Sequence, residues 1–132
     1  GKQGKRLCFQ EEWERACKGQ ESETEDRKYM FGSRWRTGAC NVQAVVDDQP
    51  KEQTILPPGT LKECTTKEGV VDLPGNVDEW TFSPGTFNSD SYVTKGGSSS
   101  RPIFQARCAS IREVPRDHRE KDLGFRCCKD AN

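Results

Sequence analysis

Apolar and polar positions recur with helical spacing in one segment near the start of the chain. In "FQEEWERACKG" (residues 9–19), four apolar residues fall on one side of a helix, and most charged residues fall on the other. These apolar residues are Phe9, Trp13, Ala16 and Cys17. Gly19 favours the end of a helix. The pattern therefore predicts one helix over this segment.

Three short apolar segments predict strands. "WTF" (residues 80–82) follows a Gly-Asn turn, "SYVTKGG" (residues 91–97) ends in glycines, and "LGFRCC" (residues 123–128) is the last of the three. Residues 42–60 show little periodicity, and we expect a long irregular region there. The acidic run at 20–26 and the charged run at 112–122 are expected to be solvated loops. The pattern predicts an α+β chain with short strands and one or two helices.

Composition indicates a single domain with a small core. The chain has 132 residues, of which 31% are hydrophobic and 32% are charged, with 12 Gly and 7 Pro. Seven cysteines are present, and disulfides often compensate for a small core in exported proteins. The chain has no CxxC pair and a single histidine, His118, which argues against zinc. We expect an oxidising compartment, hence a secreted or periplasmic protein.

The charge balance excludes some classes of partner. Lys plus Arg and Asp plus Glu are each 21, so the net formal charge is zero and nucleic acid is not an expected partner. No apolar run approaches the roughly 20 residues that cross a bilayer, so we expect no transmembrane segment. "GKQGKRLCF" at the start is not a signal peptide. If the protein is exported, we expect its targeting segment to be removed or to lie outside these residues.

Several strings, taken in order, carry a family resemblance. "KRLCFQEEWERACKG", "ACNV", "PPGT", "GVVDLPGNVDEWT", "VTKGGS", "ARCA" and "LGFRCC" together resemble the formylglycine-generating enzyme family, also called the sulfatase-modifying factor family. The resemblance implies a C-type-lectin-like fold with little regular secondary structure over residues 1–132. It covers the later part of a family domain, whose N-terminal section would precede Gly1. We expect that section to come from another chain, or the domain to be a shortened variant.

Family members oxidise a substrate cysteine to formylglycine with two copper-binding cysteines that follow a Gly-Gly-Ser motif. The matching segment here is "GGSSSRPIFQARCA", in which Ser98 matches the family serine and Arg101 stands at the first cysteine position. No cysteine lies between Ser98 and Cys108. Copper(I) requires thiolate ligands, so we expect neither copper nor the oxidase chemistry. A related branch with three iron-binding histidines is excluded by the single histidine.

The resemblance also implies part of the disulfide pattern. It pairs Cys17 with Cys108, and it pairs Cys127 with a cysteine that would precede Gly1. Cys8 and Cys128 are additional cysteines that could substitute for that missing pair. Cys40 and Cys64 flank the irregular region, and we expect them to close it. Seven is an odd number, so we expect Cys127 or Cys128 to be free or bonded to another chain.

A calcium site is the second expectation from the resemblance. Calcium takes six to eight oxygen ligands and mixes carboxylates with backbone carbonyls. In "DLPGNVDEW" the family pattern implies the side chains of Asp72 and Glu79 and the carbonyls of Gly75 and Val77. Alternatively, Asp72 and Asn76 only cap a turn and Glu79 faces solvent.

A further family site would use the Asn41 side chain, the Val42 carbonyl and an acid downstream, for which we select Asp48. Asp78 stands where the family often has Trp, so the outer side of the Asp72–Glu79 loop is expected to differ.

These observations predict a non-catalytic, disulfide- and calcium-stabilised lectin-like module for binding or assembly. The recognition surface is expected in "KGGSSSRPIFQAR", near the family's substrate groove, with a protein or peptide as partner. The residues that we expect to form this binding surface are Lys95, Ser98, Arg101 and Arg107. The same segment could instead be a surface loop without a ligand. The alternative functions are an oxidase of protein cysteine and a structural subunit of a larger extracytoplasmic complex.

Overall fold

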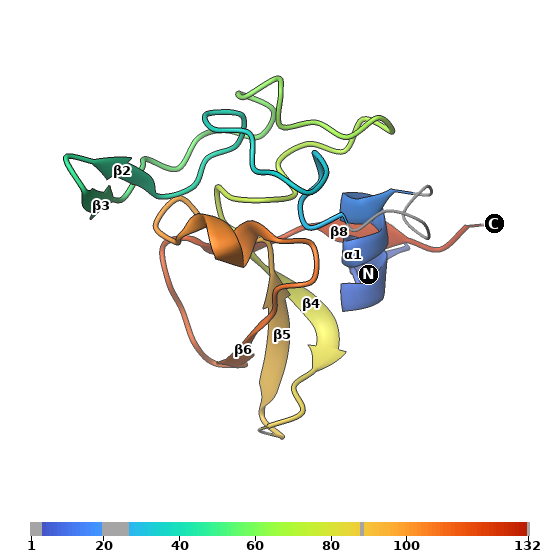
Figure 1. Ribbon diagram of the computed structural model, residues 1–132. Coiled ribbons are helices and arrows are strands. Elements are labelled where there is room, and N and C mark those ends of the chain that lie inside the picture. The colour runs from blue at the N-terminus through green and yellow to red at the C-terminus, as the bar shows by residue number, and fades with distance from the viewer. Residues whose placement is uncertain (1–3, 20–26, 88, 132) are drawn as a thin grey trace.

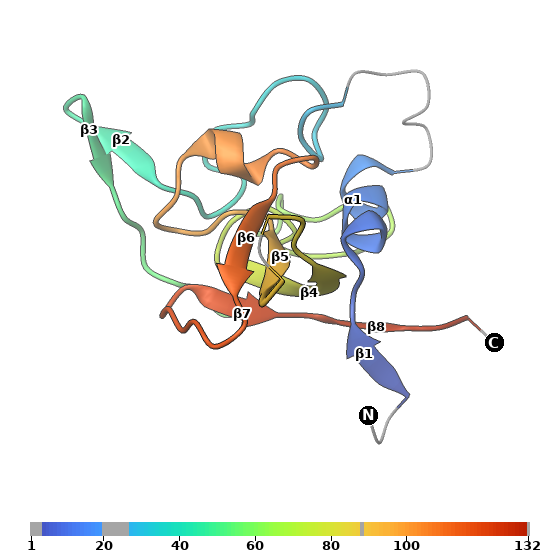
Figure 2. The same cartoon turned by 90° about the horizontal axis from the view of Figure 1, so that it is seen from below.

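A four-stranded sheet forms the middle of the molecule. The computed structural model describes residues 4–19, 27–87 and 89–131. The strand order is β6-β5-β4-β7, in which β4 pairs antiparallel with β5 and parallel with β7 (Figures 1 and 2). The strands are β4 (Asp78–Pro84), β5 (Ser91–Lys95), β6 (Arg112–Pro115) and β7 (Leu123–Phe125). The strands predicted at 80–82 and 91–97 are therefore confirmed, whereas the single strand predicted at 123–128 is divided into β7 and, in another sheet, β8 (Cys127–Lys129).

The predicted helix is α1 (Gln10–Lys18). The Glu12 carboxylate accepts the backbone N–H of Phe9 at 2.8 Å, which supplies a partner to a group that the first helical turn leaves unpaired. Gly19 follows with φ of 78°, a conformation that ends the helix and that glycine adopts without strain. Trp13 and Cys17 are the buried residues of α1, as the spacing predicts. The acidic run at 20–26 lies outside the described residues.

Two smaller sheets complete the fold. β1 (Lys5–Leu7) pairs antiparallel with β8 (Cys127–Lys129), which joins the two ends of the chain (Figure 2). β2 (Ala44–Val46) and β3 (Gln49–Lys51) form a hairpin that projects from the body. The hairpin lies in the segment expected to be irregular. Its residues show no buried alternation, so periodicity does not reveal it, and its turn is formed by Asp47 and Asp48, with φ of 50° and 61°.

The charged run at 112–122 is not wholly a solvated loop, and that prediction is wrong in part. Residues 112–115 form β6, which pairs with β5 so that Val114 lies opposite Tyr92. Val114 is buried, but it stands between Glu113 and Pro115 in a run of mostly charged residues, which hides it in the sequence. A short 3₁₀ turn, η2 (Ile103–Ala106), precedes β6.

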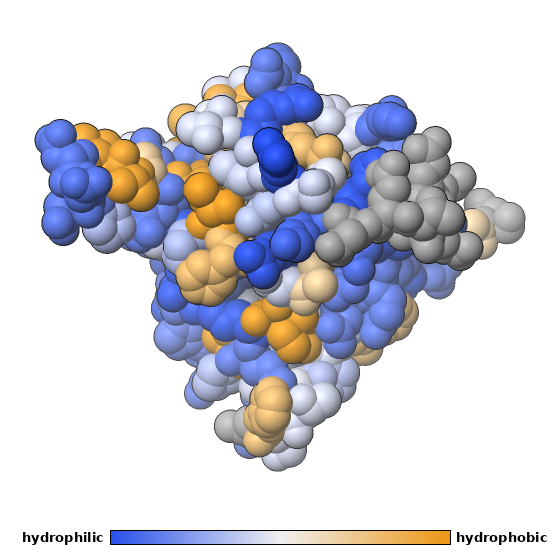
Figure 3. All heavy atoms as spheres, viewed as in Figure 1, coloured by the Kyte–Doolittle hydropathy of each residue, from blue (hydrophilic) through white to orange (hydrophobic). Residues whose placement is uncertain are grey.

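The apolar core is small and is built around Trp13 and Leu73. Met30 and four cysteines pack with them. Polar colours cover much of the face in Figure 3, and its hydrophobic colours form separate patches. Burial of this core alone leaves little margin against chain entropy, so covalent links add needed stability.

Three disulfides provide these links, and all seven cysteines lie in the described residues. The pairs are Cys8–Cys128, Cys17–Cys108 and Cys40–Cys64, and Cys127 is free and exposed. The structure thus contains the pair that the resemblance implies, the pair expected to close residues 41–63, and the substitute pair. Cys17–Cys108 spans 91 residues and fastens α1 to the segment after η2, whereas Cys40–Cys64 spans 24.

Loss of the long disulfide is expected to cost more than loss of the short one. On the loop-entropy relation, replacing Cys17 and Cys108 by alanine should lower the free energy of unfolding by about 4 to 5 kcal/mol, and replacing Cys40 and Cys64 by about 3 kcal/mol. Urea unfolding of the two double variants measures both values. An equal or reversed order would contradict this account of the fold.

Candidate functional site

The turn at residues 74–76 holds two other segments of the chain. The N–H of Gly75 donates to Gly96 O at 2.7 Å, and the N–H of Asn76 donates to Asn41 O at 2.7 Å. Gly75 has φ of 78°, and a Cβ at this position would lie 2.5 Å from Asn41 O. Only glycine fits so close a backbone approach. The turn therefore fixes the loop expected to bind calcium against Asn41 and Gly96.

Asn76 uses its side chain to hold the same region together. Its Oδ1 accepts from Leu56 N and from Asn41 Nδ2, both at 2.9 Å, and its Nδ2 donates to Leu56 O at 2.9 Å. Asn41 Nδ2 also donates to Thr54 O. Asp48 lies at the exposed tip of the β2–β3 hairpin (Figure 1). The structure therefore does not bring Asp48 to Asn41 and to the buried Val42, and the second calcium set is not assembled.

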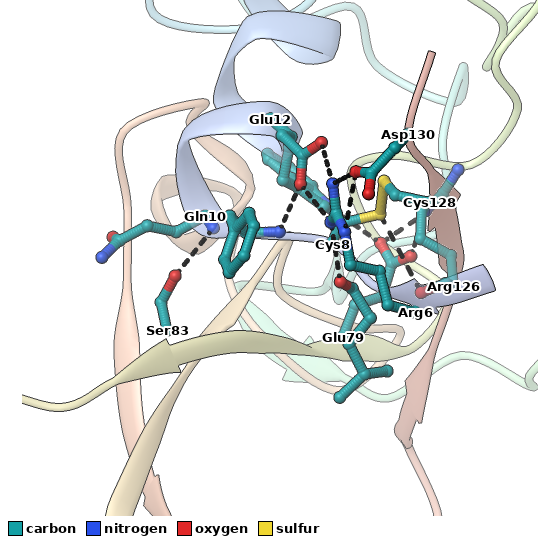
Figure 4. Close-up of a disulfide and its surroundings, with 12 residues drawn as sticks. Arg6, Cys8, Gln10, Glu12, Glu79, Ser83, Arg126, Cys128 and Asp130 are labelled. Carbon is teal, nitrogen blue, oxygen red and sulfur yellow. Dashed lines mark hydrogen bonds and ion pairs between the residues drawn. A yellow bond between two sulfur atoms is a disulfide. The ribbon is translucent and has the colours of Figure 1, made fainter. Parts of the chain in front are cut away.

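Glu79 lies in β4 with only 3% of its surface exposed. Trp13 Nε1 donates to Glu79 Oε2 at 3.0 Å, and the Arg126 guanidinium bonds both carboxylate oxygens, Oε1 through Nε and Oε2 through Nη2 at 3.4 Å. Figure 4 shows Arg126 reaching Glu79 from the C-terminal segment. Burial raises the pKa of Glu79 to about 7, against the opposing attraction of Arg126. The alternative in which Glu79 faces solvent is wrong.

Arg126 also takes up backbone oxygens of the loop. Its Nη2 donates to the carbonyls of Val71 and Asp72 at 2.9 and 3.0 Å. The Asp72 side chain has a different partner, because its Oδ2 accepts the N–H of Gly59 at 2.8 Å. The two carboxylates are thus engaged separately, and one of them already has a cation. As arranged, the residues present do not fit one ion that Asp72 and Glu79 would share.

The segment 96–100 is hydrogen-bonded to Asp122, an acid that the sequence did not indicate as a site residue. Ser98 Oγ donates to Asp122 Oδ2 at 2.5 Å, and Ser100 Oγ donates to the same oxygen. Burial favours a higher pKa for Asp122, but the hydrogen bonds from Ser100 and Ser98 outweigh it and lower the pKa. Ser98 and Ser99 are fully buried. The Ser98 and Ser100 hydroxyls therefore fix the segment, whereas the buried Ser99 Oγ has no hydrogen-bond partner among the described residues.

Lys95 is also internal, so its place in the expected recognition surface is wrong. Its Nζ donates to Glu14 Oε1 at 2.9 Å and to Cys108 O at 2.7 Å, and lies 5.3 Å from the centroid of Trp13. Burial lowers the pKa of Lys95, and Glu14 opposes this change. Ser98 is excluded from the surface for the same reason, since it is buried. β5 is covered by α1, which the sequence alone could not show.

Arg107 is exposed and Arg101 is half-buried, so these two residues stay available at a surface. Arg101 pairs with Glu120 at 3.3 Å, and Glu120 also pairs with Arg112 at 3.2 Å. These partners and the nearby His118 lower the pKa of Glu120 to about 2, with the hydrogen bond from Arg112 as the largest cause. His118 Nε2 lies 2.6 Å from Glu120 and stays exposed.

Asp78 is the other partner of Arg112 in this network. Its Oδ2 accepts from Arg112 Nε at 2.9 Å and from Thr94 Oγ1 at 2.7 Å. Burial raises the pKa of Asp78, and Thr94 and Arg112 oppose the shift. A carboxylate at the position where the family often has Trp is therefore held inside by an arginine. The sequence did not indicate a buried role for Arg112, because the charged run at 112–122 predicts a loop rather than the strand β6.

The sequence of residues 1–131 matches the model of the sulfatase-modifying factor enzyme 1-like domain. The chain belongs to this family. No long apolar helix that would cross a membrane occurs in residues 4–19, 27–87 and 89–131. In the same residues, no three His, Cys, Asp or Glu side chains are grouped so as to hold a metal ion.

Solved structures share the fold of this family member. CarF matches with a TM-score of 0.72 and 24% identity, over 97% of this chain and 48% of that one. Treponema denticola variable protein 1 matches with a TM-score of 0.70 and 22% identity, over 96% and 48%. PvdO from Pseudomonas aeruginosa matches with a TM-score of 0.69 and 16% identity, over 93% and 51%. The chain thus spans about half the length of these structures, and the expected fold is confirmed.

Removal of Arg126 is expected to destabilise the protein strongly. Arg126→Met should lower the free energy of unfolding by about 3 kcal/mol, because Glu79 is left buried without its cation. Adding Glu79→Gln should recover part of this loss, since a neutral amide oxygen still accepts the Trp13 N–H. Urea unfolding at neutral pH measures both. Lys121→Met is the control, because Lys121 pairs at the surface with Glu52; an equal effect there would refute the assignment.

Proposed function

We propose that this family member is a non-catalytic module for binding or assembly outside the cytoplasm. The observation that carries the proposal is the segment after Gly97, where the resemblance places the copper thiolates. That segment has serine and arginine instead, and its Ser98 and Ser100 hydroxyls are bonded to Asp122. Six cysteines are used in disulfides, which are typical of secreted or periplasmic proteins.

A protein or peptide partner is proposed to bind beside η2. Phe104 in η2 is 57% exposed, Arg107 follows it at the surface, and Val45 in the neighbouring hairpin is 71% exposed. Backbone bonds from Gln43 to Arg101 and from Gln53 to Ser99 tie the base of the hairpin to this segment (Figure 1). Figure 3 shows hydrophobic colours on the projecting hairpin. An apolar contact with a nearby arginine suits a partner that has apolar and acidic side chains.

Two other functions are alternatives to this proposal. An oxidase would need copper thiolates, and the described residues offer one free thiol, Cys127 in β8, outside the segment after Gly97. A structural subunit is favoured by the exposed free thiol of Cys127, a group that can bond to another chain.

The non-catalytic proposal has a direct test. The purified chain is supplied with copper and a peptide that carries one cysteine, and aldehyde formation is followed by mass spectrometry and by capture with a hydrazide. We expect no aldehyde above that formed by copper alone, because the thiolate pair is missing. An active member of the family is the positive control. Aldehyde that depends on this protein would overturn the proposal.

Calcium binding stays a prediction from the resemblance. For Glu79 to ligate an ion, it would have to leave Arg126, so the prediction also implies a rearrangement of this pair. If calcium binds at the loop, chelation should lower the melting temperature by several degrees, and Asp72→Asn should reduce that shift. Asp48→Asn is the matched control, because Asp48 lies at the hairpin tip. A melting temperature that changes with neither calcium nor chelator would contradict the prediction. Arg126 would then be the cation that pairs with Glu79 in this loop.

A further inference from the structure

The strand β4 places its polar residues inside and its aromatic residues outside. Glu79, Thr81 and Ser83 are buried, whereas Trp80 is half-buried and Phe82 is 55% exposed. Alternate residues of a strand point to opposite sides of a sheet. In a small soluble domain the apolar side of a strand normally faces the core, so this order is inverted. The outer side of β4 is thus a candidate contact surface.

Neighbouring residues extend this outer side into an aromatic strip. The ring centroid of Phe82 lies 5.9 Å from that of Phe9 and 6.5 Å from that of Tyr92 in β5. On the other edge, Phe125 in β7 pairs in register with Trp80 and is 66% exposed. We define the aromatic strip as Phe9, Trp80, Phe82, Tyr92 and Phe125. It runs across β5, β4 and β7. These five side chains form a larger apolar surface than a single exposed residue does.

The free thiol lies on the same side as this strip. Figure 2 shows β7 continuing into β8 as one extended segment. Cys127 follows Phe125 by two residues, so its side chain points to the same side, and Arg126 between them points inward to Glu79. Cys127 is exposed and unpaired. A reactive group beside an uncovered apolar surface is a liability in an oxidising compartment.

Charges of both signs stand at the rim of the strip. The Arg6 guanidinium lies 4.5 Å from the centroid of Phe9 and pairs with Asp130 at 2.7 Å, where the Asp130 side chain is 83% exposed (Figure 4). The chain as a whole has no net charge, so two copies do not repel each other. A two-fold contact places the same surface on both sides, so cations of one rim can meet anions of the other.

We propose that the aromatic strip is the dimer interface for a second copy of this chain. The strip supplies the apolar centre, Arg6 and Asp130 supply a self-complementary rim, and Cys127 is covered when the copies meet. This interface is separate from the partner surface beside η2, so it goes beyond the proposed function. The rival occupant is a further section of the fold, since the residues given match only about half of the length of the solved structures.

Light scattering after gel filtration tests the proposal over a range of protein concentrations. Cys127→Ser is used as the background, so that a disulfide between copies cannot account for the result. We expect a mass of twice the chain at high concentration. Adding Phe82→Asn and Phe125→Asn should raise the dimer dissociation constant at least tenfold. Phe87→Asn with Phe104→Asn is the matched control, because both rings are highly exposed outside the strip.

Thiol labelling gives an independent readout in the unchanged chain. Alkylation of Cys127 should slow at least tenfold as the protein concentration rises through the dimer range, and it should stay fast in the Phe82→Asn, Phe125→Asn variant. Near-UV circular dichroism shows whether each variant is folded. A folded chain that stays monomeric at every concentration would overturn the proposal and favour the rival occupant. A dimer that both aromatic double variants leave intact would place the interface elsewhere and overturn it as well.

Discussion

The pairing of Glu79 with Arg126 is the interaction on which the rest of the structure depends. Glu79 lies in the central strand β4, Arg126 lies between the two C-terminal strands, and Trp13 adds an indole N–H from α1. Three parts of the chain that are far apart in sequence therefore meet at one buried carboxylate. Removal of any one partner leaves a buried polar group unpaired, so helix, sheet and C-terminal segment should form together.

Other buried polar groups follow the same principle. Lys95 is covered by α1 and Trp13 and is paired with Glu14, and Asp78 is paired with Arg112. Each of these charges has a partner of opposite sign, as the cost of desolvation requires. The chain has few apolar residues to bury, and specific polar partners and three disulfides compensate for this. A fold maintained in this way depends on particular residues more than on general hydrophobicity.

The same arrangement indicates that the surfaces of the molecule, rather than the turn at 74–76, are its candidate binding sites. The turn at 74–76 serves the fold by holding Asn41 and Gly96, and the segment after Gly97 is closed onto Asp122. The exposed features are the Phe104 and Arg107 surface beside η2 and the aromatic strip on the outer side of β4. The two surfaces share no residue, so the proposed partner binding and the proposed self-association involve different parts of the chain.

The sequence by itself determined the features that rest on local pattern. The helix follows from the spacing of Trp13 and Cys17, the strand β4 from "WTF", and the family from strings spread along the whole chain. These signals are short-range or cumulative, so no knowledge of long-range contacts is needed to detect them.

Only the tertiary structure decided which charged and polar residues are internal. Lys95, Ser98 and Glu79 look like surface or ligand residues in the sequence, because nothing in a linear pattern shows that α1, Asp122 and Arg126 come to meet them. The strand β6 was hidden for the same reason, since its pairing with β5 and the partners of Arg112 lie elsewhere in the chain. A side chain's environment is set by segments that fold against it, and that information is absent from its own neighbourhood in the sequence.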